Sequence, residues 1–236
     1  MSTYTRIGAF VDLNAVDANL DAIKAGLSEK TKVTAVVKTD AYGHGACAIA
    51  RHIEKREELW GFATAMLEEA LELRDAGIRK PLLILGYVYP EDCEEIAGLL
   101  EEEPLEDGSF CTQIRPAVYS LETGRELSKA AMKQSALLGK EILVPVHIKV
   151  DTGMSRIGFA DTKESVEMIK EIAGLPGIRL EGLFTHFARA DEADKTSVNS
   201  QIARFRVFEE ACREAGLPIP IRHCSNSAGI MESKEA

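Results

Sequence analysis

Lys38 is the residue of this chain whose position best suits covalent chemistry. It directly follows Val33–Val37, a run of small and β-branched apolar residues typical of a strand buried on both faces of a parallel sheet. A turn segment with Tyr42 and two glycines comes next, and a helical stretch extends from Ala46 to Lys55. The sequence therefore predicts a strand, a tight loop and a helix N-terminus, with a primary amine at the end of the strand.

Two chemistries could use this arrangement. Gly43–Ala48 fits the G-x-G-x-x-A form of the dinucleotide fingerprint, whose glycines bring the backbone close to a pyrophosphate at a helix N-terminus. That fingerprint also needs an acidic residue at the end of the next strand, but after the next strand-like run, Leu59–Ala65, Glu68 already lies inside a predicted helix. The other chemistry is a Schiff base, in which Lys38 condenses with an aldehyde cofactor. A plain solvated lysine is the third interpretation, because most lysine side chains are exposed.

Composition restricts the classes of partner. The chain has 236 residues, 45% of them hydrophobic, a net charge of −10 and a pI near 5.1. The negative net charge argues against nucleic acid or an anionic membrane surface as a binding partner. An anionic ligand would need positively charged groups at its own site. No stretch approaches the roughly 18 apolar residues of a membrane span, and the N-terminus lacks a signal-peptide core, so we expect a cytoplasmic protein. Five widely spaced cysteines without a C-x-x-C motif predict reduced thiols and no zinc site.

Strand-like runs alternate with helical patterns along the chain. The runs are Lys32–Lys38, Leu59–Ala65, Pro81–Tyr87, Cys111–Ser120, Leu143–Asp151, Leu180–Phe187 and Ile221–Ser227. Helices are predicted, among others, over Met66–Ala76, Glu91–Glu102, Leu121–Gly139 and Ser197–Ala215. An additional strand over Ile7–Leu13 precedes a predicted helix over Ala15–Leu27, with Asp12 or Asn14 as its N-cap. The acidic segment Glu101–Gly108 contains proline and glycine, so we expect a solvated loop and predict no metal site.

Seven strand–helix repeats favour a (β/α)8 TIM-type barrel over an open doubly wound sheet. An eighth strand is needed to close the ring and remove two sheet edges, and the count of repeats stops at seven. We therefore expect residues 1–236 to be a single, incomplete barrel domain, lacking the last strand, from a longer protein.

In such a barrel the chemistry lies where strands finish, and three later strand ends carry suitable side chains. Arg156 follows the run Leu143–Asp151, and its guanidinium suits capture of a carboxylate, although a surface ion pair is the plainer interpretation. His186 ends the next run, where a satisfied core histidine is the commoner case. His223–Gly229 offers hydroxyls and backbone amides to a phosphate, or alternatively caps a helix.

Four segments together resemble the alanine racemases. Residues 38–45 read KTDAYGHG, close to the family's pyridoxal-phosphate lysine motif K-A-N-A-Y-G-H-G, with conservative departures at Thr39 and Asp40. Residues 149–158 are similar to K-x-D-T-G-M-x-R-x-G, residues 185–188 to T-H-F-A, and residues 223–228 to H-x-x-N-S-A. The four matches occur in the family's order and extend from Lys38 to Ser227, so together they are far more specific than any one of them.

The resemblance implies that pyridoxal 5'-phosphate is bound at the strand ends. Lys38 would carry it as an internal aldimine and serve as one of two catalytic bases. Tyr42 and Ser227 would bind the cofactor phosphate. Asn226 would also contact the cofactor, and His223 would support these residues without contacting the cofactor itself.

The resemblance further implies roles for the later strand ends. Arg156 would contact the substrate carboxylate and a cofactor oxygen, supported by Lys149, which is a carbamate in some members. His186 would lie beside the cofactor ring within a hydrogen-bond network to the catalytic tyrosine. In the family that tyrosine is the second base, and it reaches the site from the C-terminal β-domain of the partner subunit in a homodimer. The same kind of domain also supplies an arginine to the pyridine nitrogen. We therefore expect this chain alone to have little or no racemase activity.

The implied function is interconversion of L-alanine and D-alanine, which supplies D-alanine for peptidoglycan. Two alternatives remain within pyridoxal-phosphate proteins: a racemase for serine or another amino acid, and a non-catalytic single-domain barrel of vitamin B6 homeostasis. The Tyr42–Gly45 segment and the segment around Arg156 argue against the second, because such carriers do not share them in this form. A nicotinamide enzyme, based on the glycine fingerprint, is the least favoured alternative.

Overall fold

The structure is a computed structural model that describes residues 8–217 and 219–233. Seven strands follow one another across a curved sheet in the order β1-β2-β3-β5-β6-β8-β9, and each neighbouring pair is parallel. They are β1 (Val33–Val36), β2 (Leu59–Thr64), β3 (Leu82–Ile84), β5 (Ile114–Val118), β6 (Ile142–Asp151), β8 (Ile178–Phe184) and β9 (Ile221–His223). Each overlaps one of the seven predicted runs. Two short strands, β4 (Phe110–Cys111) and β7 (Phe159–Ala160), pair with β6 beside this path.

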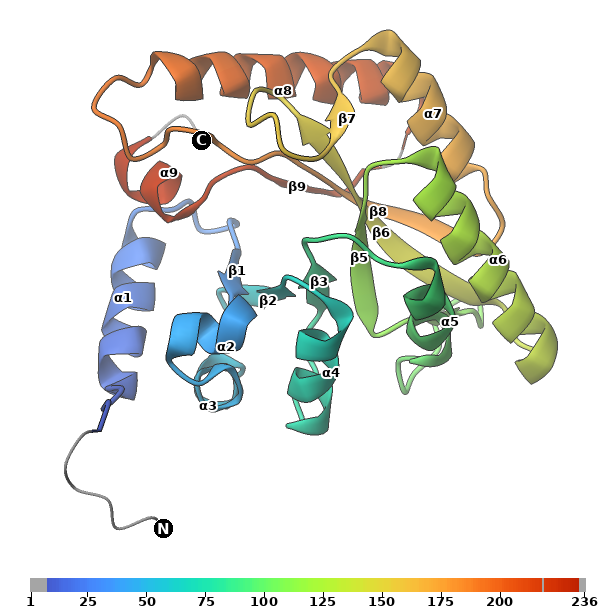
Figure 1. Cartoon of the computed structure of the whole chain (residues 1–236), viewed down its shortest axis with the longest axis horizontal. Helices are drawn as coiled ribbons and strands as arrows, with labels where there is room; N and C mark the ends of the chain where they lie inside the picture. The colour runs from blue at the N-terminus through green and yellow to red at the C-terminus, as the bar shows by residue number, and fades with distance from the viewer. Residues whose placement is uncertain (1–7, 218, 234–236) are drawn as a thin grey trace.

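The sheet curls like the wall of a barrel without closing (Figure 1). Within residues 8–217 and 219–233, no pairing joins β9 back to β1, so these two strands form the edges. The prediction of a barrel of the (β/α)8 type that lacks one strand is confirmed. The central strands are the most buried: every residue of β5 is buried, as are eight of the ten in β6, which is typical of parallel strands covered on both faces.

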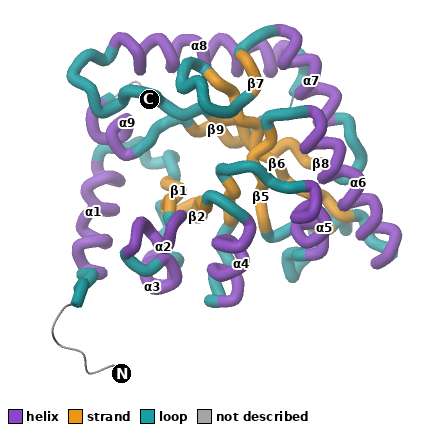
Figure 2. Tube along the Cα trace, in the orientation of Figure 1, coloured by secondary structure: helices purple, strands orange, loops and turns teal. Residues whose placement is uncertain are grey.

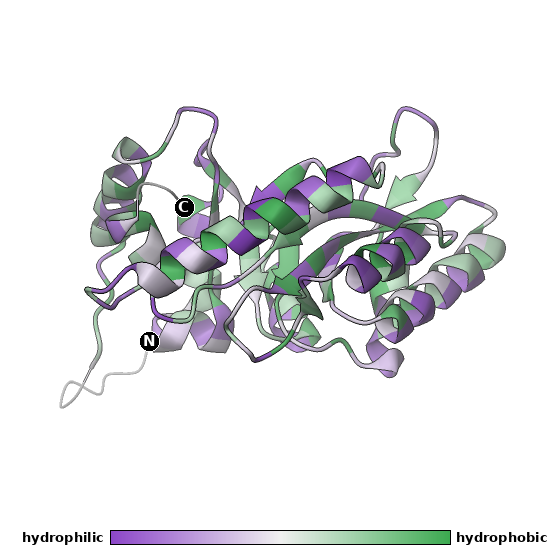
Figure 3. Ribbon diagram, turned by 90° about the horizontal axis from the view of Figure 1, so that it is seen from above, coloured by the Kyte–Doolittle hydropathy of each residue, from purple (hydrophilic) through white to green (hydrophobic). Residues whose placement is uncertain are grey.

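Helices surround the outside of the curved sheet (Figure 2). They are α1 (Leu13–Ala25), α3 (Ala46–Ile53), α4 (Leu67–Asp75), α5 (Pro90–Gly98), α6 (Leu121–Leu138), α7 (Lys163–Ala173), α8 (Thr196–Glu214) and α9 (Ser227–Glu232), in addition to a short turn, α2 (Lys38–Gly43). Hydrophobic and hydrophilic residues alternate along α8 (Figure 3), as expected for a helix that buries one side. In α7 the buried side includes Val166, Ile169 and Ile172, at the spacing of successive helical turns.

Local signals fix several helix boundaries. Asp12 caps α1, because its Oδ1 accepts a hydrogen bond from the Asn14 backbone N–H at 2.9 Å. The helix therefore begins two residues before its predicted start. Gly139 ends α6 in the left-handed region with φ 62°.

Two expectations about the N-terminal strands are wrong. The described part of the predicted strand Ile7–Leu13 contains no strand, since residues 8–12 are irregular and Leu13 already belongs to α1. Burial of β1 on both faces is also incorrect, because Val36 is 40% exposed. An apolar run predicts a strand but does not reveal its position in the sheet, and β1 lies at an edge.

Within the described ranges, we find no helix with both the length and the apolar character required to cross a bilayer. The same residues contain no cluster of three or more histidine, cysteine or acidic side chains suited to a metal ion. The five cysteines are all free.

Candidate active site

The chain turns with left-handed geometry directly after Lys38. Thr39, Asp40, Ala41 and Tyr42 have φ between 52° and 57°, a region that costs about 1–2 kcal/mol for each residue with a side chain. One turn separates Lys38 from Tyr42, so the two side chains lie on the same side, with Nζ of Lys38 6.0 Å from the centre of the Tyr42 ring. The predicted tight loop is thus a turn that places the Lys38 amine and the Tyr42 ring near each other.

The Asp40 side chain occupies the N-terminus of α3. Its Oδ1 accepts a hydrogen bond from the Ala46 backbone N–H at 2.6 Å, and the Gly45 N–H donates to the Asp40 carbonyl at 2.9 Å. In a dinucleotide fingerprint this helix end would receive a pyrophosphate. A carboxylate already bound there repels such a group, which argues against the nicotinamide alternative.

Lys149 is buried in β6, with 3% of its surface exposed. Its Nζ donates a hydrogen bond to the Val150 carbonyl at 2.7 Å and lies 5.6 Å from the centre of the Phe184 ring. Burial lowers the pKa of Lys149 to about 8, from an ordinary value of 10.5. A sizeable fraction of this amine is therefore neutral near pH 8, when ordinary lysines are fully charged.

The depressed pKa of Lys149 predicts a pH dependence of stability. Between about pH 8 and 10.5 the folded chain binds fewer protons than the unfolded chain, so the contribution of Lys149 to the free energy of unfolding rises with pH. The slope is at most about 1.4 kcal/mol per pH unit, the value for one proton. Urea unfolding at several pH values should reveal this rise in the wild type and lose it in Lys149→Met. The exposed Lys170→Met serves as the control, and equal slopes in the two variants would contradict the assignment.

Arg156 lies in the loop between β6 and β7, and it is exposed. The Asp151 carboxylate shapes the start of this loop, because Oδ1 accepts hydrogen bonds from the backbone N–H groups of Gly153 at 2.9 Å and Ser155 at 3.0 Å. The guanidinium thus remains available to a ligand, on a loop whose base is ordered.

His186 follows β8 and stands among three cationic side chains. Burial lowers the pKa of His186, and the positive charges of Arg156, Lys149 and Lys38 lower it further, in that order. These three cations come from two strand ends, yet all act on one imidazole. The charges of three predicted site residues thus act on the fourth, and they favour the neutral form of His186.

Gln201 of α8 anchors the backbone around His186, a role that sequence analysis missed. Gln201 is 2% exposed, and its side-chain amide makes three hydrogen bonds. Nε2 donates to the His186 carbonyl at 3.0 Å and to Thr152 Oγ1 at 3.3 Å, while Oε1 accepts from the Ala188 N–H at 2.9 Å. One amide therefore ties the segment after β8 to the segment after β6.

His223 ends β9 with its ring stacked on Phe184, at a centroid distance of 4.5 Å and an interplanar angle of 6°. Burial is the main cause that lowers the pKa of His223 well below its ordinary value. A few residues later, Asn226 caps α9 through Oδ1, which accepts from the Gly229 N–H at 2.9 Å, and its Nδ2 donates to the Phe187 carbonyl at 3.5 Å. The capping interpretation is therefore correct for Asn226, which also contacts the segment that carries His186. Ser227, the first residue of α9, is exposed.

A buried polar chain leads from His223 into the barrel, and sequence analysis missed it as well. His223 Nε2 and His147 Nδ1 share a hydrogen bond of 2.9 Å, and His147 Nε2 lies 3.1 Å from Glu181 Oε2. Glu181 also pairs with Arg115 at 3.4 Å, and Arg115 pairs with Glu101 at 2.8 Å. Burial raises the pKa of Glu181, but the hydrogen bond to His147 and the charge of Arg115 lower it overall. The carboxylate is therefore ionised, and it accepts the hydrogen bond from His147 Nε2–H.

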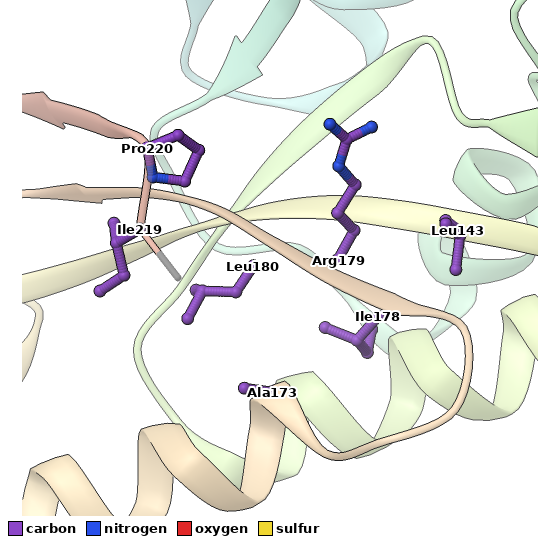
Figure 4. Close-up of a pocket in the computed structure, with 7 residues that line it drawn as sticks. All are labelled: Leu143, Ala173, Ile178, Arg179, Leu180, Ile219 and Pro220. Atoms are coloured by element: carbon purple, nitrogen blue, oxygen red, sulfur yellow. The ribbon is translucent and has the colours of Figure 1, made fainter. Parts of the chain in front are cut away.

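A hollow of about 600 Å³ lies elsewhere, at the amino ends of β6 and β8. Ile178 and Leu180 point toward Ala173 of α7, whereas Arg179 points to the other side of the strand (Figure 4). The lining is mostly apolar, and its charged member, Arg179, turns away from Ala173 and the α7 side of the hollow. We therefore locate the candidate active site at the opposite, carboxyl ends of the strands, where the cations gather.

The chain matches known proteins over nearly its full length. Residues 11–236 match the family described as "Alanine racemase, N-terminal domain". Alanine racemases of Methanococcus maripaludis and Clostridium perfringens are 43% and 39% identical, each over 229 residues, covering 97% of this chain. These alignments cover 56% and 54% of the two relatives, so the chain spans about half the length of the curated relatives it matches.

Solved structures agree. Alanine racemase of Clostridium difficile 630 in complex with cycloserine aligns with a TM-score of 0.83 and 39% identity, covering 94% of this chain and 56% of that one. Alanine racemase from Bacillus anthracis with bound L-Ala-P aligns with a TM-score of 0.78 and 31% identity, covering 94% and 52%. The resemblance to the alanine racemases is thereby confirmed over residues 11–236, and the chain belongs to the alanine racemase N-terminal domain family.

Proposed function

We propose that this chain is the cofactor-binding barrel of an enzyme that interconverts L-alanine and D-alanine with pyridoxal 5'-phosphate. One observation carries the proposal: the positive charges of Arg156, Lys149 and Lys38 all act on the pKa of His186 at the carboxyl ends of the strands, in a chain of net charge −10. Such a cationic cluster suits a ligand with a phosphate and a substrate with a carboxylate.

The residues present fit this cofactor. Lys38 offers a primary amine for the aldehyde, and Tyr42, 61% exposed beside it, offers a hydroxyl to the phosphate. Ser227 is likewise exposed and begins a helix, where a hydroxyl and backbone N–H groups can donate to an anion. Asn226 and His223 hold this segment and the end of β9 in place, through the α9 cap and the stack on Phe184.

When bound, pyridoxal phosphate acidifies the α-hydrogen of an attached amino acid. The amine of Lys38 then takes or returns the proton at the α-carbon on one face. Arg156 binds the carboxylate of the amino acid, and Lys149 supports this arginine. His186, whose neutral form is favoured, can accept or donate a hydrogen bond beside the cofactor ring.

Alanine is the substrate that the relatives favour. The solved relatives include complexes with cycloserine and with L-Ala-P, bound to alanine racemases of similar fold. Following the family, the proposal includes a cytoplasmic homodimer that supplies D-alanine for peptidoglycan. A racemase for serine or another amino acid is a distinguishable outcome, because the preferred substrate follows from comparing racemisation rates among amino acids.

Reductive trapping tests the proposal on this chain directly. Pyridoxal phosphate is added, the absorbance band of the lysine adduct is followed, and borohydride then makes the link permanent. Peptide mapping should find the label on Lys38. A label on another lysine, or an unmodified chain, would refute the proposal.

A further inference from the structure

One carboxylate joins the ends of the first two strands. Glu69 lies in the first turn of α4, with Oε1 accepting a hydrogen bond from the Thr39 backbone N–H at 2.6 Å. Its Oε2 accepts from the Ala65 N–H at 2.7 Å. Thr39 is the residue directly after Lys38, and Ala65 is the residue directly after β2. Hydrogen bonds from backbone N–H groups to a carboxylate are stronger than those between neutral groups.

The strand that presents Lys38 has little other support at its end. β1 is an edge strand of four residues, and its pairing with β2 ends at Val36 and Ala63, with one further bond from the Val37 N–H to the Ala63 carbonyl at 2.9 Å. Beyond that point the ladder stops and the left-handed turn begins at Thr39. A strained conformation persists only where its surroundings hold it.

Asp40 secures the far end of the turn at α3, as described above, and Glu69 secures its beginning. From these contacts we infer that Glu69 is a positioning residue for Lys38: its two carboxylate oxygens hold the turn that aims the amine. The inference rests on the proposed function for the role of the amine, but the clamp itself is a property of this chain's own residues.

A matched pair of variants tests the clamp. Glu69→Gln keeps the size of the side chain but leaves one acceptor oxygen, and its NH2 group must face one of the two backbone N–H groups. Glu68→Gln removes the same charge from the same first turn of α4, at an exposed position, so any effect on the helix dipole is equal.

The first readout needs no cofactor. Amide hydrogen exchange of the peptide over residues 37–43 should become about 10-fold faster in Glu69→Gln, the order of effect of losing a charged hydrogen bond. Exchange in Glu68→Gln should match the wild type. Peptides of β6 serve as the internal reference for the whole fold. Faster exchange there too would mean a general structural role, and equal exchange in both variants would mean no clamp; either result overturns the inference.

The second readout is the rate at which borohydride-trappable pyridoxal phosphate appears on Lys38. We expect it to fall about 10-fold in Glu69→Gln and to stay within about twofold of wild type in Glu68→Gln. Labelling at Lys38 with equal rates in both variants overturns the inference and leaves the proposed function standing. A wild-type chain that is not labelled at Lys38 refutes the proposed function, and the exchange experiment still decides the clamp.

Discussion

Lys38→Ala removes the borohydride-stable cofactor label from this chain completely, and in a protein that also carries the C-terminal β-domain we expect racemisation to fall by at least about 10²–10⁴-fold, the contribution of a positioned acid–base group. Two losses combine in this one change. The variant lacks the nucleophile for the aldehyde, and it lacks the amine that moves the α-proton on one face. Absorbance spectra and mass spectra of the trapped chain measure the loss of the label, and the rate of D-alanine formation from L-alanine measures the loss of racemisation.

Lys32→Ala is the matched control for this experiment. Lys32 directly precedes β1, is exposed, and donates to the Glu57 carbonyl at 2.6 Å. Because Lys32 lies at the opposite, amino end of β1 from Lys38, Lys32→Ala should keep both label and activity. If Lys38→Ala retains the label, or if Lys32→Ala loses it, the role given to Lys38 is wrong.

Glu181→Leu should lower the free energy of unfolding by about 3–5 kcal/mol, the cost of removing one partner from a buried ion pair. The Glu181 side chain is 11% exposed and lies between two buried groups. Its loss leaves the Nε of Arg115 and the Nε2 of His147, which is fully buried, without their shared acceptor. Urea unfolding followed by circular dichroism measures the change.

Two variants calibrate this result. Glu171→Leu breaks the exposed pair of Glu171 with Arg125, for which we expect a loss of less than about 1 kcal/mol. Both donors contact the same Glu181 oxygen, so Glu181→Gln can keep that acceptor while it removes the negative charge, and its stability should fall between those of the other variants. Equal stability of Glu181→Leu and Glu171→Leu would show that the buried chain contributes nothing beyond a surface ion pair.

Sequence reasoning found the strand ends because apolar runs mark buried strands whatever their neighbours are. It also found Lys38, Arg156 and His186, since each lies at such an end within a segment resembling one family. It did not find the left-handed turn, because the four residues 39–42 include no glycine that would indicate positive φ.

The supporting residues escaped for a different reason. Glu69 and Gln201 lie in helical patterns, where a polar side chain is ordinarily a solvated one, and only the fold reveals that they turn inward onto strand ends. Glu181 and Arg115 lie inside strand-like runs that were recognised by their apolar members. Their partners are distant in sequence, so the pairing depends on the order of strands in the sheet. The absence of a strand over residues 8–12 likewise reflects tertiary packing that local propensity does not encode.

The open sheet has a consequence for self-association. In the described residues its two edges are β1 and β9, strands of four and three residues. An exposed edge is a template on which another chain can add a strand, and brevity is one means by which natural proteins discourage such addition. Because both edge strands are so short, neither can form with a strand of another chain the extended pairing that starts aggregation.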